Sequence, residues 1–145
     1  MTPNQIELVQ ASFAKVAPIS EQAAALFYAR LFELAPGVRG LFKGDMVEQG
    51  RKLMTMLGSV TRQLDKLEAL VPVAQRLAER HVAYGAQPAH YAVVGVALID
   101  TLDKGLGADF TPDVRQAWET AYGTLSAVMI AAAAELPAET TEPLA

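Results

Sequence analysis

Two histidines, His81 and His90, are the strongest candidate metal ligands in this 145-residue chain, which contains no cysteine. Without cysteine, disulfides, zinc–thiolate sites, iron–sulfur clusters and cysteine nucleophiles are excluded. The histidines are nine residues apart, which would put them on opposite faces of one continuous helix, and Pro88 interrupts the segment between them. The sequence therefore does not favour a two-histidine metal site.

Other catalytic patterns are also missing. The sequence contains no His-Glu-x-x-His, no Gly-x-Ser-x-Gly and no phosphate-binding P-loop. The Gly-Leu-Gly at 105–107 has no preceding strand and is typical of a helix end rather than a dinucleotide site. The carboxylates of Glu79, Asp100 and Asp103 fall on faces expected to be solvated, with no pairing suited to acid–base catalysis.

One site remains possible around His81. In the stretch LAERHVAYG and the residues before it, Val73, Leu77 and His81 are spaced by four and share one face of a helix. Haem supplies four of its own iron ligands, so one imidazole in an apolar crevice is enough to hold it. A packed core histidine would give the same pattern, and periodicity alone does not separate the two interpretations.

The surrounding elements are predicted to be helices. Capping residues or prolines predict helix starts at Thr2, Ser20, Asp45, Pro72, Pro88 and Thr111. Pro36 follows the second helix, and Pro137 follows the last, which is about 24 residues long. No alternating strand pair or hairpin turn is present. These signals predict an all-α single domain with six to eight helices and short connections.

Composition limits the remaining possibilities. The chain is 52% hydrophobic and 19% charged, with a net charge of −4, which is typical of a folded domain and unlike a nucleic-acid-binding protein. Its first ten residues do not resemble a secretory signal, and no apolar run is long enough to cross a bilayer. We therefore expect a soluble cytoplasmic protein that binds neither nucleic acid nor membrane. Residues 137–145, polar and proline-rich, are predicted to be a flexible tail.

Five stretches resemble successive helices of a bacterial globin, in the right order and spacing. They are residues 27–36 with 41–42, 49–54, 77–85, 90–95 and 117–123. The likeness covers about residues 3–136 and is to a single-domain bacterial haemoglobin, related to the globin domain of flavohaemoglobins and locally similar to neuroglobin. It implies a globin domain over 1–136, with seven to eight helices packed three-over-three around haem b.

The resemblance also implies roles for individual residues. His81 matches the proximal iron ligand, and Phe42 matches a phenylalanine that stacks on the haem. Gln49 and Leu53 match the two positions that face the sixth iron site. Tyr28 matches a distal tyrosine that would donate a hydrogen bond to an oxygen ligand.

Further positions are implied to contact the cofactor. These are Leu57, Leu77, Tyr91, Val94 and Leu98, with Arg51, Lys52 and Arg80 as possible partners of the haem propionates. Other interpretations remain open for three of the site residues. Phe42 could be plain core, Gln49 an exposed helix-start residue, and Tyr28 a buried tyrosine bonded to a backbone carbonyl.

The proximal side departs from the flavohaemoglobin pattern. In that family a tyrosine at the position of Tyr91 works with a glutamate on the last helix, which makes the imidazole more electron-donating. Counting from Trp118, the glutamate position falls on Ala133. Glu135 lies two residues further, about 200° around the helix, and faces elsewhere. The sequence therefore predicts no carboxylate at this position.

Several functions follow from the resemblance. The first is reversible binding of oxygen, or of NO or CO, for oxygen storage, delivery or the handling of NO stress. The second is nitric oxide dioxygenation with a separate reductase, because the 145 residues contain no flavin or nicotinamide domain. A haem-based gas sensor and a cofactor-free helical bundle are the remaining alternatives. The protein is expected to be a monomer or a weak homodimer.

Overall fold

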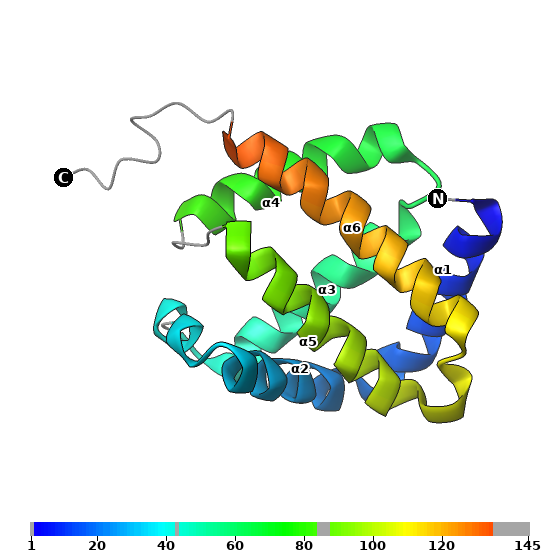
Figure 1. Cartoon of the computed structure of the whole chain (residues 1–145), viewed down its shortest axis with the longest axis horizontal. Coiled ribbons are helices and arrows are strands. Elements are labelled where there is room, and N and C mark those ends of the chain that lie inside the picture. The colour runs from blue at the N-terminus through cyan, green and yellow to red at the C-terminus, as the bar shows by residue number, and fades with distance from the viewer. Residues whose placement is uncertain (1, 43, 84–87, 135–145) are drawn as a thin grey trace.

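The computed structural model describes residues 2–42, 44–83 and 88–134, and in these ranges it contains six α-helices, three short 3₁₀ helices and no strand (Figure 1). The elements are, in order, α1 (Pro3–Val16), η1 (Ala17–Ile19), α2 (Ser20–Leu34), η2 (Pro36–Leu41), α3 (Met46–Arg62), α4 (Leu67–Ala83), α5 (Pro88–Leu106), η3 (Gly107–Asp109) and α6 (Pro112–Ala134). The predicted all-α architecture is confirmed.

Most of the predicted helix starts are correct. Thr2 caps α1 through a capping box with Gln5, and Asp45 caps α3 by accepting a hydrogen bond from the Val47 amide. The Thr111 hydroxyl accepts a hydrogen bond from Val114 in the first turn of α6. Local capping chemistry therefore sets these helix starts.

Two starts were predicted wrongly. Ser20 is the first residue of α2 rather than its cap, because the preceding turn η1 leads directly into the helix through Ile19. Pro72 lies inside α4, which begins at Leu67. A proline there removes one intrahelical hydrogen bond, but packing of the apolar face continues the helix through it.

The helix count is also lower than the seven to eight predicted. The connecting segments η1 before α2, η2 after α2 and η3 after α5 form only short 3₁₀ helices. In addition, α4 is continuous through Pro72. Gly107, with φ of +56°, ends α5 in the left-handed region that favours glycine. The predicted helix end at 105–107 is therefore correct.

The helices form two crossing groups of three. One group is α2, α5 and α6, in which α2 packs on α5 and α5 on α6. The other is α1, α3 and α4, in which α1 packs on α3. Contacts of α4 with α6, α1 with α6, and α2 with α3 join the groups, as the crossing ribbons in Figure 1 show. This arrangement agrees with the three-over-three packing predicted. No helix in the described ranges is both long and apolar enough to cross a membrane.

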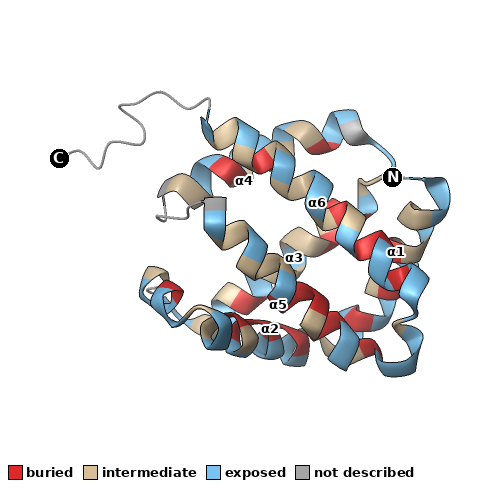
Figure 2. Cartoon of the chain, viewed as in Figure 1, coloured by how far each residue is buried: buried red, intermediate tan, exposed pale blue. Residues whose placement is uncertain are grey.

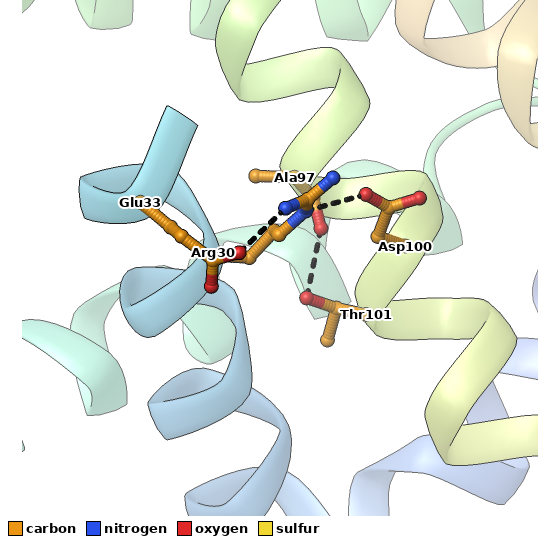
Figure 3. A network of polar contacts seen from close by, with 5 residues as sticks. All are labelled: Arg30, Glu33, Ala97, Asp100 and Thr101. Atoms are coloured by element: carbon orange, nitrogen blue, oxygen red, sulfur yellow. Dashed lines mark hydrogen bonds and ion pairs between the residues drawn. The ribbon is translucent and has the colours of Figure 1, made fainter. Parts of the chain in front are cut away.

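Polar contacts fix two of these helix pairs. Figure 3 shows Arg30 on α2 donating from Nε to Asp100 on α5 at 2.8 Å, and from a second guanidinium nitrogen to Glu33. In the core, the Trp118 indole donates to the Ser12 hydroxyl at 2.8 Å and joins α6 to α1. The Trp118 bond specifies which faces of α6 and α1 meet, because a buried donor without an acceptor is costly, whereas the Arg30–Asp100 pair is partly exposed.

The buried residues form two clusters, and Figure 2 shows the larger one around the crossings of α1, α2, α5 and α6. It includes Phe27, Leu102 and Trp118. The smaller cluster joins α4 to α6 through Ala74, Ala78 and Met129. Helices α3 and α4 thus anchor to different parts of the core, and the predicted site residues lie on both.

Candidate functional site

Tyr28, in the middle of α2, is buried among aromatic rings. Its ring meets those of Phe27 and Phe42 edge-on, at centroid distances of 5.0 and 5.3 Å, and lies 6.0 Å from Phe32. Burial raises the pKa of the Tyr28 phenol, so the hydroxyl remains protonated and able to donate at neutral pH. These contacts hold the side chain in one orientation.

The Gln49 side chain on α3 lies close enough to the Tyr28 phenol to lower its pKa, which partly offsets the rise caused by burial. The glutamine is half-buried, and its place on the ligand side stays a prediction. The structure therefore brings together the two polar residues predicted for the ligand side.

His81 lies near the end of α4 and is half-buried. Its Nδ1 is 2.6 Å from the carbonyl oxygen of Leu77, one turn earlier. A carbonyl only accepts, so Nδ1 must carry the proton, and the neutral ring then has its lone pair on Nε2. This is the tautomer and the backbone partner that typically orient a metal-binding histidine.

Tyr91 and Tyr122 support the histidine from neighbouring helices. The Tyr91 ring lies 6.2 Å from the His81 ring, as predicted from the sequence. The Tyr122 hydroxyl donates to the Tyr91 carbonyl at 2.6 Å, and its ring crosses Gly95, where a Cβ would lie only 2.8 Å away. Sequence reasoning gave Tyr122 and Gly95 no role, because nothing in the spacing of two helices reveals that one ring lies across the other backbone.

The other apolar residues predicted to contact a cofactor share an intermediate burial. Phe42, Leu53, Leu57 and Val94 pack at the edge of the larger cluster, whereas Leu77 and Tyr91 pack at the edge of the smaller one. Leu98 is the exception, because it is buried, with 6% of its surface exposed. These large side chains present apolar surface at the edges of the two core clusters, and His81 lies beside Tyr91 of the smaller one. A flat, mostly apolar cofactor with one open ligand position fits these residues.

The cationic residues predicted to contact the haem propionates lie on the surface and not at the edges of the core clusters. Lys52 and Arg80 are exposed, and Arg51 approaches Glu48 at 3.4 Å on the surface. Ala133 is the residue at the position that a proximal glutamate takes in flavohaemoglobins. Glu135 and the predicted tail at 137–145 lie outside the described residues. The roles of Lys52, Arg80 and Arg51 as propionate partners stay predictions.

Comparison with known proteins decides the family. A family model described as Globin matches residues 25–129, which include Tyr28, Gln49 and His81. The chain belongs to the globin family. A bacterial globin from Campylobacter jejuni has the same fold, with a TM-score of 0.80 at 23% identity over 92% of this chain and 97% of that chain. The globin fold predicted from the sequence is thus confirmed.

Two flavohaemoproteins are among the relatives of this globin. That of Deinococcus radiodurans is 30% identical over 90% of this chain and 33% of its own length, and that of Vibrio cholerae is 28% identical over 90% and 34%. The chain therefore spans about a third of the length of these curated relatives. An engineered carbene transferase and nitric oxide dioxygenase candidate from Rhodothermus marinus superposes with a TM-score of 0.84, at 30% identity, covering 93% and 94% of the two chains. The family and these relatives imply a haem cofactor.

Proposed function

We propose that this globin holds haem b through His81 and binds oxygen reversibly. The single observation that carries the proposal is that a globin chain holds Nδ1 of His81 against the Leu77 carbonyl, while its buried Tyr28 has the Gln49 side chain beside the phenol. When bound, haem would supply an iron able to take a diatomic ligand.

Each residue has a separable task in this proposal. The Leu77 carbonyl fixes the imidazole plane and directs Nε2 away from its own helix. Phe42, Leu53 and Leu98 exclude water from the ring, and Tyr28 donates a hydrogen bond toward the negative end of a polarised ligand. In an apolar crevice such a bond is stronger than in water, because no solvent competes for it.

The first test is the ability to bind haem. The absorption spectrum of protein supplied with haemin should show a ferrous Soret band that shifts on addition of CO. His81→Ala should lose haem or bind it weakly, while the matched variant His90→Ala should retain the wild-type spectrum. A wild-type protein without a haem spectrum, or retention of the spectrum in His81→Ala, would rule out this ligand assignment.

Nitric oxide dioxygenation is the second candidate. It is favoured by the flavohaemoprotein relatives and by the likeness to the Rhodothermus marinus protein named as a nitric oxide dioxygenase candidate. Sustained turnover would require electrons from a reductase acting on this globin. Continued nitrate formation from NO with an added reductase and NADH would support an enzyme. Nitrate limited to one equivalent per haem would support oxygen binding as the main function.

A further inference from the structure

Three aromatic rings on α2 and at the end of η2 contact one another in pairs. The Phe32 ring stacks on that of Tyr28, with the planes 29° apart and the centroids 6.0 Å apart, and meets the Phe42 ring edge-on at 5.5 Å. Tyr28 and Phe42 are themselves in contact, at a centroid distance of 5.3 Å. Phe32 thus touches both the predicted hydrogen-bond donor and the phenylalanine predicted to stack on the haem.

Arg39 of η2 links Phe32 and Phe42 a second time. Its guanidinium lies 5.1 Å from the centre of the half-buried Phe32 ring, a distance at which a cation is attracted to the ring face. Its carbonyl oxygen accepts a hydrogen bond from the Phe42 amide at 3.1 Å. The Phe32 ring is therefore held from η2 as well as from its own helix.

The Tyr28 ring, by contrast, is not packed on every side. It lines a cavity of about 440 Å³ between α2 and α3, and Phe32, four residues later on the same face of α2, lines that cavity beside it. A close-packed core would fix the ring by contacts all around, but the side toward the cavity supplies few atoms. The neighbouring rings must therefore hold the orientation of Tyr28, and removing Phe32 would let the phenol turn into the cavity.

We propose that Phe32 is a positioning residue, which holds the Tyr28 phenol toward the ligand side and thereby slows ligand release. The inference rests on the proposed haem function, in which the Tyr28 hydroxyl donates to the ligand. Phe32 has no polar side-chain atom with which to bind a ligand, so it acts through Tyr28. Its effect on release should therefore vanish when the Tyr28 hydroxyl is absent.

A double-mutant cycle on the haem-loaded protein tests this dependence. Oxygen release, measured by stopped-flow displacement with CO, should be about fivefold faster in Phe32→Ala, because one aromatic contact changes the balance between ring orientations by a factor of about two to ten. In the Tyr28→Phe background, the same substitution should change the rate by less than about twofold. Phe110→Ala is the matched control, because Phe110 is also half-buried against the larger cluster but lies at the end of η3. Its release rate should stay within about twofold of the wild type.

The infrared spectrum of the CO complex reports on the same hydrogen bond. A donor to the CO oxygen weakens the C–O bond and lowers its stretching frequency. The wild type and Phe110→Ala should show this lowered band. Phe32→Ala should add a second band at the higher frequency of Tyr28→Phe, because the phenol is turned away for part of the time. Phe32→Leu, which keeps apolar volume but has no flat face, replaces Phe32→Ala in each measurement if the latter does not fold.

A wild-type release rate and a single wild-type C–O band in Phe32→Ala would overturn the positioning role. Equal acceleration with and without the Tyr28 hydroxyl, or in Phe110→Ala, would overturn it too.

Failure of the wild type to form a CO complex would instead overturn the haem function. The positioning of Tyr28 is then tested without haem, by a carbon-13 NMR titration of its Cζ resonance, which is identified by its absence in Tyr28→Phe. Burial raises the pKa of Tyr28, and in Phe32→Ala this pKa should move back toward the ordinary value of about 10. An unchanged pKa would show that Phe32 does not hold the ring in place.

Discussion

The Gln49 side chain of α3 lies beside the phenol of Tyr28 on α2, whose ring meets that of Phe42 edge-on, and the amide lowers the tyrosine pKa against the rise caused by burial. The tyrosine is buried, and the glutamine is half-buried. Two different helices thus place one polar pair beside the aromatic rings that surround Tyr28. The pair can polarise a ligand without placing a charge in the crevice.

Replacing Tyr28 by phenylalanine should speed oxygen release from the haem protein about tenfold, because a hydrogen bond worth about 1–2 kcal/mol to the ligand is lost. The ring contacts with Phe42 and Phe27 remain, so the fold should be retained. Stopped-flow displacement of oxygen by CO measures the release rate directly.

Tyr91→Phe is the matched control for this experiment, because Tyr91 lies beside His81 and has no predicted contact with the ligand. Its oxygen release should remain within about twofold of the wild type, since a difference that small corresponds to about 0.4 kcal/mol. An unchanged release rate in Tyr28→Phe would show that the hydroxyl does not contact the ligand.

Much of the fold could be predicted because its signals are local. Thr2, Asp45 and Thr111 cap helices through atoms two or three residues away, and spacing by four placed Leu77 and His81 on one face. The hydrogen bond between those two follows from the same helical geometry. The pairing of Tyr28 with Gln49 required the globin resemblance, since no local pattern relates positions on two crossing helices.

What the sequence did not predict depends on contacts distant in the chain. Ser12 and Trp118 are 106 residues apart, and neither has a pattern that names the other as its partner. Proline is usually found in the first turn of a helix, but tertiary packing extends α4 on the N-terminal side of Pro72. The position of the Tyr122 ring across Gly95 likewise depends on how α5 and α6 cross. Sequence periodicity therefore does not reveal how two helices cross.

Alkaline pH should destabilise this protein through its buried phenols. Burial raises the pKa values of Tyr28, Tyr91 and Tyr122 above the ordinary value of about 10, because the phenolate is poorly solvated. The unfolded chain loses these protons near pH 10 while the folded chain retains them. Stability is therefore fully present below about pH 9 and falls as the pH rises above about 10.

Urea unfolding followed by circular dichroism across pH 8 to about 11.5 measures this fall. Tyr122→Phe removes one of the shifted phenols, so its stability should decline less steeply than that of the wild type over the alkaline range. Equal slopes for the two proteins would mean that Tyr122 has the same pKa in the folded and unfolded chains.

Ser12→Ala should destabilise the fold by about 1–2 kcal/mol, because the buried Trp118 indole loses its acceptor. Thermal unfolding measures the loss. Thr124→Ala is the control: its hydroxyl is exposed and donates to Thr120 within its own helix, so the melting temperature should change little. Equal melting temperatures for wild type and Ser12→Ala would mean that water satisfies the indole as well as the serine does.

Two glycine-to-alanine substitutions in neighbouring helices should have opposite effects on stability. At Gly95 the new Cβ would lie 2.8 Å from the Tyr122 ring, so overpacking of about 1–3 kcal/mol should exceed the gain of about 1 kcal/mol in helix propensity. At Gly123, an exposed position on α6, nothing lies within 4 Å of the added Cβ, and the propensity gain should stand alone. Gly123→Ala should therefore unfold at higher urea concentration than the wild type, and Gly95→Ala at lower. If both variants gained stability, the Tyr122 ring must move aside at little cost, and its hydrogen bond to the Tyr91 carbonyl would not hold it against α5.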